Sequence, residues 1–299
     1  MNLLYRIIYQ STINRIIRNI NYFLAPLLPS KIKIHPSGKM KVSIDKNHGS
    51  FILKTNQTSY ISREIFWEGA LNFEYSPIFI GLIKKMKLFI DIGSNIGYYS
   101  ILGSKVNPEL ITYAFEPSRG ANFYLSENVK LNNLSNRIFV ESSALMDASG
   151  EIDFYEIRNK KYPSIYNLSG EHNIGTKTYK LSQKTKVKAT TLDAYFSDNN
   201  INALNLIKLD TEGAEAYILK GAHEVIKQHQ PIIICELLFN KIEKELEMIM
   251  LAHAYKFYAH TEKGLKLLDS LVRDTDNGVR DVFFVPLSKM DLIEEWIVD

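Results

Sequence analysis

The sequence predicts an α/β fold built on a mostly parallel sheet with helices on both faces. From residue 88 onward, short apolar runs alternate with segments of helical periodicity, which is the pattern of repeated strand–helix units. The first of these runs leads into a glycine turn and then a helix, as in open α/β sheets that bind a ligand at the strand end. The 299 residues, 45% hydrophobic and 23% charged, suit one large domain with an appendage.

The appendage comes first: we expect residues 1–62 to form an N-terminal extension and residues 63–299 the α/β domain. Residues 13–24 predict an amphipathic helix that Pro26 ends. Because most amphipathic helices face a core, packing on this chain or on a sister subunit is favoured. Docking on a membrane surface or a partner is the alternative. The apolar stripe consists of Ile13, Ile16, Ile17, Ile20, Phe23 and Leu24, opposite Asn14, Arg15, Arg18, Asn19 and Asn21.

Residues 31–62 change to a period of two. Ile32 and Ile34 alternate with lysines, and after a turn at residues 35–38 the alternation resumes over residues 39–44. This predicts a hairpin, with a third strand near Phe51–Leu53. Helical spacing returns over residues 63–87.

The α/β domain then follows in order. Strands are expected at 88–91, 110–115, 138–140, 204–209 and 231–235, with helices at 98–105, 118–132, from 190, from 215 through 228, and 241–254. A closing pair near 256–258 and 281–285 ends the sheet. The alternation is interrupted by a predicted strand pair, 151–157 with 184–189. The polar segment between them is either a substrate lid or a disordered loop.

The turn after the first strand has the pattern D-x-G-x-N-x-G, from Asp91 through Gly97. It lacks the G-x-G-x-x-G spacing of dinucleotide folds and the Gly-Lys-Ser/Thr of a P-loop. A carboxylate at Asp91 would repel a pyrophosphate and suit a cationic ligand such as S-adenosylmethionine. Glu116, at the end of the next strand, is placed to bind ribose hydroxyls. The alternatives are an ordinary strand-to-helix turn for the first motif and a helix-start charge for Glu116.

A second group of residues with charged side chains lies at the end of the strand at 204–209. Lys208, Asp210, Glu212 and Glu215 crowd its exit, and Gly213 permits the turn. Carboxylates at such a place could supply a general base or hold a divalent cation. The alternative is a helix N-terminus with acids matched to its dipole.

Charge and composition narrow the class of protein. The net charge is only +3, and no long basic run supports nucleic-acid binding. The single cysteine, Cys235, cannot form a disulfide within the chain. No stretch approaches the ~20 apolar residues that span a bilayer, and early arginines argue against a signal peptide. We expect a cytoplasmic protein, with contact of residues 13–24 with the inner face of the membrane as the alternative.

The segments LFIDIGSNIGYYS, AFEP, TLDAYF, LIKLDTEGAEAYILKGA and PIIICEL, in this order, resemble the FkbM family of S-adenosylmethionine-dependent methyltransferases. The resemblance covers roughly residues 60–286. It implies a Rossmann-like class I methyltransferase sheet whose last strand is antiparallel. It also implies cofactor contacts at Asp91, Gly93, Asn95, Gly97 and Glu116, with Ser143 and Ala144 near adenine. We include Ser94, Tyr98, Pro117 and Asp210 in this predicted cofactor site.

The expected function is transfer of a methyl group from S-adenosylmethionine to a hydroxyl. The acceptor class that the family implies is a sugar of a surface glycan or glycolipid, or a small molecule. Asp210 is the predicted base or metal anchor, assisted by Glu212, and Lys208 orients or pairs with these acids. A divalent cation and a homo-oligomer are further expectations. The alternatives are a methyltransferase acting on RNA or protein and a non-catalytic interaction module.

Overall fold

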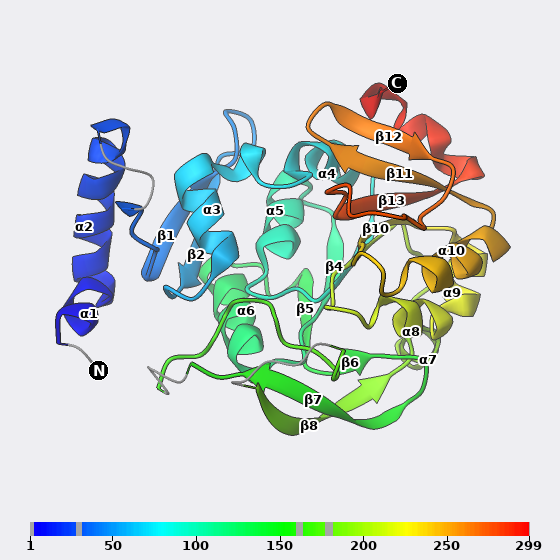
Figure 1. Cartoon of the computed structure of the whole chain (residues 1–299), viewed down its shortest axis with the longest axis horizontal. Coiled ribbons are helices and arrows are strands. Elements are labelled where there is room, and N and C mark those ends of the chain that lie inside the picture. Colours follow the sequence, from blue (N-terminus) through cyan, green and yellow to red (C-terminus); the bar gives the residue numbers. More distant parts are fainter. Residues whose placement is uncertain (1–2, 28–31, 160–163, 177–181, 299) are drawn as a thin grey trace.

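The computed structural model describes residues 3–27, 32–159, 164–176 and 182–298. A nine-stranded sheet forms its centre, in the order β14-β12-β11-β13-β10-β9-β3-β4-β5 (Figure 1). Five neighbouring strands of this sheet are parallel, which confirms the predicted α/β class. They are β5 (Ile138–Glu141), β4 (Ile111–Phe115), β3 (Leu88–Ile92), β9 (Leu206–Leu209) and β10 (Ile232–Glu236).

The other end of the sheet is mostly antiparallel. β13 (Asp281–Pro286) pairs antiparallel with both β10 and β11 (Tyr255–Thr261), as the predicted closing pair required. Two further strands, which the sequence analysis did not anticipate, extend this edge: β12 (Gly264–Leu268) and the two-residue β14 (Ile297–Val298). Both are short and partly exposed, so their sequences carry little apolar alternation.

Helices cover both faces of the sheet and enclose two cores. One core includes residues of α4 (Ser76–Ile83), α5 (Tyr98–Val106) and α6 (Arg119–Leu131). The other includes residues of α7 (Leu192–Asp198), α8 (Glu215–Lys220), α9 (His223–His229) and α10 (Glu243–Ala252). Along β3 the side chains alternate between them, with Phe89 in the first and Ile90 in the second. This strand is buried on both faces, which explains its continuous apolar sequence.

The N-terminal extension contains α1 (Leu3–Ile8), α2 (Ser11–Leu24), a short 3₁₀ turn η1 (Ala25–Leu27) and one hairpin, β1 (Gly38–Ser43) with β2 (Ser50–Thr55). The hairpin shares the first core with the α/β domain through Val42 and Leu53. The side-chain amides of Asn128 on α6 and of Asn132, just after this helix, bond the backbone of β2 at Lys54 and Ile52. The 62/63 domain boundary stays a prediction.

One strand prediction in this extension is wrong. The predicted strands at residues 39–44 and 51–53 do pair as a hairpin, with its turn at residues 44–49, whereas residues 32–34 form no strand. The reason is that α2 and α3 (Tyr60–Glu68) bond this segment's backbone. Asn21 accepts a hydrogen bond from the Ile34 amide at 2.8 Å, and the Trp67 indole donates to the Ile34 carbonyl at 3.3 Å. Beyond α3, a 3₁₀ turn η3 (Ala70–Asn72) leads to α4.

The interruption of the α/β alternation is a three-stranded sheet of β6 (Ala144–Leu145), β8 (Ser182–Thr190) and β7 (Gly150–Ile157). The predicted pairing of residues 151–157 with 184–189 is confirmed as an antiparallel ladder. Residues 160–163 and 177–181 of the predicted insertion lie outside the described residues. The intervening residues 164–176 lie over the end of the main sheet, as described below.

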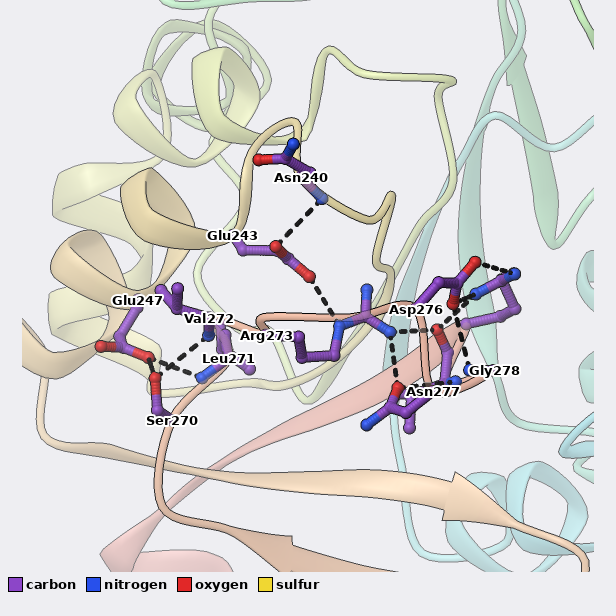
Figure 2. A network of polar contacts seen from close by, with 12 residues as sticks. Asn240, Glu243, Glu247, Ser270, Leu271, Val272, Arg273, Asp276, Asn277 and Gly278 are labelled. Atoms are coloured by element: carbon purple, nitrogen blue, oxygen red, sulfur yellow. Dashed lines mark hydrogen bonds and ion pairs between the residues drawn. The ribbon is translucent and has the colours of Figure 1, made fainter.

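A network of hydrogen bonds and ion pairs holds the loop of residues 273–280, which precedes β13 (Figure 2). The Arg273 guanidinium donates to Glu243 of α10 at 2.6 Å and to the Val279 carbonyl at 2.8 Å, and the Arg273–Glu243 pair is buried. Glu243 also accepts from the Asn240 amide. This network fixes residues 273–280 next to the strand end that carries Asp281.

After β13 the chain ends in two 3₁₀ turns, η4 (Leu287–Leu292) and η5 (Glu294–Trp296), before β14. None of the helices in the described part of the chain combines the length and the apolar character needed to cross a bilayer.

Candidate active site

The glycine turn leaves the carboxyl end of β3 and begins α5. Gly93 and Gly97 have φ angles of +73° and +86°, and Asn95 has +50°, so the turn uses left-handed backbone at three positions. The Gly93 and Ser94 amides both donate to the Phe115 carbonyl, at 3.0 and 3.1 Å. These bonds tie the turn to the end of β4 and leave its inner surface facing a cavity of about 230 Å³.

Asp91 is buried at the floor of this cavity. Its Oδ2 accepts a hydrogen bond from Ser100 Oγ on α5, and Oδ1 has no hydrogen-bond partner among the described residues. Lys208 Nζ lies 4.0 Å from that Oδ1 atom. Burial raises the pKa of Asp91, against the opposing effect of Lys208. The free carboxylate oxygen therefore favours a ligand that brings a donor or a positive charge.

Lys208 contacts acidic residues of both sequence motifs, Asp91 of the glycine turn and Asp210 of the acidic loop. The register of β3 with β9 places Lys208 beside Asp91, and its ammonium group bonds Asp210 at 3.1 Å. Burial alone would lower the pKa of Lys208, but the carboxylates of Asp210, Asp91 and Glu74 together raise it above its ordinary value. Lys208 is therefore a permanent cation in the wall of the cavity.

Glu116 follows β4 and lies against the turn. Its two carboxylate oxygens accept from the Asn95 amide at 2.9 Å and the Ser118 amide at 2.8 Å. Burial raises the pKa of Glu116 to about 7, although both backbone donors favour the ionised form. These contacts fix the carboxylate at the rim of the cavity, where its remaining lone pairs could accept hydroxyl donors.

A second, smaller cavity of about 30 Å³ adjoins the first through Gly93 and Pro117. Its lining is mostly apolar and includes Ser143, Ala144, Phe115 and Ile174. A flat apolar slot beside a polar cavity is the arrangement that an adenosine-bearing ligand needs.

Most of the predicted site residues meet at these two cavities. The first is lined by Asp91, Gly93, Ser94, Asn95, Tyr98, Glu116, Pro117, Lys208, Asp210 and Glu212, and the second by Ser143 and Ala144. Gly97 lines neither; it precedes α5 and packs against Leu125, where a β-carbon would come within 2.5 Å. Gly97 therefore allows the turn to pack against α6 and does not line the cavity.

Glu215 has a different place from the other acids of its motif. It is buried, and its Oε1 accepts from the Thr211 and Gly213 amides and the Thr211 hydroxyl. These bonds hold the loop that carries Asp210 and Glu212. The helix-start alternative therefore describes Glu215 better than a catalytic role does.

Glu74 is the main site residue that sequence reasoning missed. Its carboxylate accepts from Tyr99 Oη at 2.9 Å and lines the cavity together with Asp210. Glu74 is exposed through the two cavities that it lines, although many protein atoms lie around its carboxylate. Burial, and next the charge of Asp210, raise the pKa of Glu74 to about 7. The sequence offered only one weak signal, the position of residues 67–74 just before the turn.

The described part of the insertion covers the cavity. Ser169, Gly170 and His172 line it, and a β-carbon on Gly170 would lie 3.3 Å from Nδ2 of the Asn95 side chain. This segment is bound on both sides. Thr58 accepts from the Leu168 amide, and Thr176 Oγ1 donates to the Glu212 carbonyl. Residues 164–176 thus cover part of the cavity, and their role as a substrate lid stays a prediction.

The residues fit S-adenosylmethionine. Two buried acceptor atoms that face the cavity, Asp91 Oδ1 and Asn95 Oδ1, lack hydrogen-bond partners among the described residues. A cofactor amino group would satisfy such atoms, Glu116 could take ribose hydroxyls, and the apolar slot suits adenine. A divalent cation fits less well, because no group of three His, Cys, Asp or Glu side chains in the described residues could hold one.

Comparison with known proteins agrees with this geometry. The model of the methyltransferase FkbM domain matches residues 91–257, which include both strand-end motifs and more than half of the chain. The chain belongs to the FkbM methyltransferase family. The resemblance stated from the sequence is thereby confirmed, and with it the prediction of a methyltransferase.

Individual relatives are distant. Methyltransferase sdnD of Sordaria araneosa is 23% identical over 56% of this chain and 70% of its own length. The 2-O-methyltransferase NoeI of Sinorhizobium fredii is 24% identical over 48% of this chain and 61% of its own length. The hexuronic acid methyltransferase AglP of Haloferax volcanii is 26% identical over 48% of this chain and 53% of its own length. This FkbM chain thus aligns with only part of each relative.

Among solved structures, a methyltransferase FkbM from Methylobacillus flagellatus aligns at 16% identity with a TM-score of 0.41. That alignment covers 66% of this chain and 43% of the other. The METTL16 methyltransferase domain aligns at 16% identity with a TM-score of 0.41, over 71% of this chain and 66% of the other.

Proposed function

We propose that this FkbM-family protein transfers the methyl group of S-adenosylmethionine to a hydroxyl group of a sugar. The observation that carries the proposal is the meeting of both strand-end motifs at one covered cavity, with Asp91, Lys208 and Asp210 in contact. A non-catalytic protein would have no need for Lys208 and the carboxylates of Asp91, Asp210 and Glu74 around it. This counts against the non-catalytic alternative.

The chain's own task in such a reaction is to orient two reactants and to remove a proton. Bound S-adenosylmethionine supplies an electrophilic methyl carbon on a sulfonium. The acceptor oxygen would displace the thioether sulfur from that carbon, and a carboxylate of this chain would take the hydroxyl proton. Residues 164–176 cover part of the site, which would limit the access of water to it.

Asp210 is our proposed proton acceptor, with Glu212 beside it on the same loop. Asp210 lies at the exit of β9, at the polar end of the cavity, and its side chain is 45% exposed to it. Its carboxylate already has a cationic partner in Lys208. That pair could orient the acceptor hydroxyl as well as take its proton.

Glu74 is a second candidate for the same step, and its raised pKa favours it. A base with a pKa of about 7 is half ionised near neutral pH and accepts a proton most effectively there. Glu74 also has a φ of +44°, a rare backbone conformation for a residue of its type. Strained backbone of this kind often occurs at functional sites.

The acceptor class is inferred from a third cavity and from the names of relatives. A cavity of about 810 Å³ meets the cofactor cavity at Glu74. Its other lining residues include Asn72, His260, Lys263, Asn277 and Trp296, a mixture of hydrogen-bonding groups and an aromatic face that suits a sugar. One relative is named a 2-O-methyltransferase and another a hexuronic acid methyltransferase.

The first test is calorimetry of S-adenosylmethionine binding. The wild-type chain is expected to bind, and Asp91→Asn is expected to lose roughly 100-fold in affinity because a buried charged contact is removed. Unchanged affinity in Asp91→Asn would overturn the assignment of the cavity. Leu251→Ser, an exposed change on α10, is the matched control.

The second test measures release of S-adenosylhomocysteine with uronic-acid oligosaccharides, neutral oligosaccharides, RNA and protein as acceptors. Turnover with a saccharide supports the proposal. Turnover with RNA or protein alone would establish the alternative substrate class instead.

A further inference from the structure

The N-terminal helix α2 is packed through its polar side. Asn14, Arg18 and Asn21 have exposed fractions of 0%, 2% and 7%, whereas Phe23 is 83% exposed. The sequence favoured packing of the apolar stripe on this chain or on a sister subunit, and within this chain the polar side packs instead. The helix is amphipathic as predicted, but most of its apolar surface faces solvent.

Specific hydrogen bonds fix this orientation. Arg18 donates to the carbonyls of Ser37 and Lys39 at 2.9 and 2.6 Å, and to Asn14 Oδ1. Asn14 donates to the His35 carbonyl and accepts from the Ser37 amide. Rotating the apolar stripe inward would leave these buried groups without partners, at a cost for each of them. The outward apolar face is therefore built into the fold.

The exposed apolar surface runs over both N-terminal helices. In Figure 1, α1 and α2 form the outermost layer at one edge, beyond β1 and β2. Large apolar side chains exposed in this number on two adjoining helices indicate an interaction site. We name it the N-terminal apolar face; it consists of Leu3, Leu4, Ile7, Ile16, Ile20, Phe23, Leu24 and Leu27, all exposed.

Charge is segregated onto the same part of the chain. The first 44 residues contain seven of the 36 Lys and Arg residues and none of the 33 Asp and Glu residues. The remaining residues therefore carry 29 basic against 33 acidic side chains. Arg6 and Arg15 are exposed on α1 and α2 themselves. The segment that carries the apolar face thus has only basic charges of its own, although Glu68 pairs with Lys33 and Glu127 pairs with Lys54 from elsewhere in the chain.

A basic groove adjoins the apolar face. A cavity of about 270 Å³ between the start of α2 and β1 is lined by Arg15, Lys39 and Lys54, with Ser11 and Thr12. Lysine and arginine at the edge of an apolar helix face are the groups that contact phosphate headgroups of anionic lipids.

We propose that the N-terminal apolar face inserts into the headgroup region of a membrane that contains anionic lipid. The apolar stripe would supply burial in the acyl boundary, and the basic groove would supply attraction to the charged surface. A second copy of this chain is a poorer occupant, because pairing two such faces would bring the exposed Arg6 and Arg15 of both copies together. The inference is independent of which acceptor the enzyme methylates.

The test is sedimentation of the full chain with vesicles of phosphatidylcholine, with and without phosphatidylglycerol. The wild-type protein is expected to sediment with the anionic vesicles and to be released by salt, because the attraction is screened. Ile16→Ser/Ile20→Ser/Phe23→Ser removes exposed apolar surface and is expected to weaken binding by roughly tenfold or more. Arg6→Glu/Arg15→Glu keeps the apolar face and is expected to weaken binding to a comparable extent.

The matched control is Met248→Ser/Leu251→Ser, which removes exposed apolar side chains from α10. It should bind vesicles as the wild type does. Calorimetry with S-adenosylmethionine and thermal melting verify that each variant is folded, and they separate this inference from the proposed function. Absence of wild-type binding, or equal binding by the triple serine variant, would overturn the proposal. A dimer in light scattering that the triple variant dissociates would also overturn it, since the face would then be a subunit interface.

Discussion

Gly93 and Asp210 touch through their backbones. A β-carbon on Gly93 would lie 1.8 Å from the Asp210 carbonyl oxygen. The Asp210 amide in turn donates to the Ile92 carbonyl at 3.2 Å. The glycine turn and the acidic loop, more than a hundred residues apart in sequence, are thus fitted to one another at the ends of adjacent strands. Only a residue without a side chain permits this approach.

The first prediction concerns this contact. Gly93→Ala combines left-handed backbone strain with a clash, so the free energy of unfolding should fall by about 2–5 kcal/mol, and cofactor affinity should fall with it. Gly49→Ala is the control, because Gly49 has a φ of +70° but nothing within 4 Å of the added carbon. It should lose only about 1 kcal/mol. Urea unfolding and calorimetry measure both. Equal losses in the two variants would show that the contact with Asp210 does not matter.

The second prediction separates the two candidate bases. With Glu74 as proton acceptor, the rate should rise with pH through about 7, as this carboxyl ionises. Glu74→Gln should then lower the rate by about 10²–10⁴-fold and remove that rise, with cofactor affinity retained. Asp210→Asn should also retain cofactor binding but keep the rise in its residual activity. The reverse pattern, with the rise lost only in Asp210→Asn, would assign the proton to Asp210.

The sequence was sufficient for the fold and for bringing most of the predicted site residues to two adjoining cavities, because both depend on local patterns. The run Leu88–Ile92 is apolar since it is buried on both faces, and the glycines after it are needed by the turn itself. Lys208 and Asp91 could be placed together because adjacent parallel strands end at one edge of the sheet.

Two features could not be predicted, for physical reasons. Glu74 reaches the cavity through the path of residues 69–76, which includes a left-handed backbone at Glu74 that no sequence pattern signals. The orientation of α2 depends on Arg18, which satisfies backbone carbonyls at residues 37 and 39. Periodicity identifies an apolar stripe, but it does not tell which side of the helix has the better partners.

The third prediction concerns pH and stability. The pKa of Glu116 is about 7 in the folded chain, above its unfolded value near 4.5, because burial disfavours the charge. The stabilising effect of its protonated form is therefore complete below about pH 4.5 and is lost as the pH rises through about 7. Glu116→Gln mimics the neutral acid, so the stability of the variant relative to the wild type should increase by up to about 3 kcal/mol between pH 4.5 and pH 8.

Urea unfolding of both proteins across this pH range measures the effect. Glu109→Gln, on a loop between α5 and β4, is the control and should show no such change. A constant difference between wild type and Glu116→Gln would mean that Glu116 titrates alike in the folded and unfolded chains.

The fourth prediction concerns the network of Figure 2. The side chains of Arg273 and Glu243 are 8% and 5% exposed, and their atoms lie 2.6 Å apart. Arg273→Ala would leave the Glu243 carboxylate buried without its cation, which should cost about 3–5 kcal/mol of unfolding free energy. The same change frees residues 273–280, which lead to β13 and border the proposed acceptor cavity.

Arg280→Ala is the matched control, because the Arg280–Asp276 pair lies in the same loop but is half exposed at 51% and 41%. Removing an exposed pair should cost no more than about 1 kcal/mol. Thermal or urea unfolding distinguishes the two variants, and the Michaelis constant for the acceptor, measured below each melting transition, reports on the loop. A loss for Arg273→Ala as small as that for Arg280→Ala would show that water replaces the guanidinium. The network would then be a surface feature, and the position of the loop would depend on the β-strand pairing of Asp281 alone.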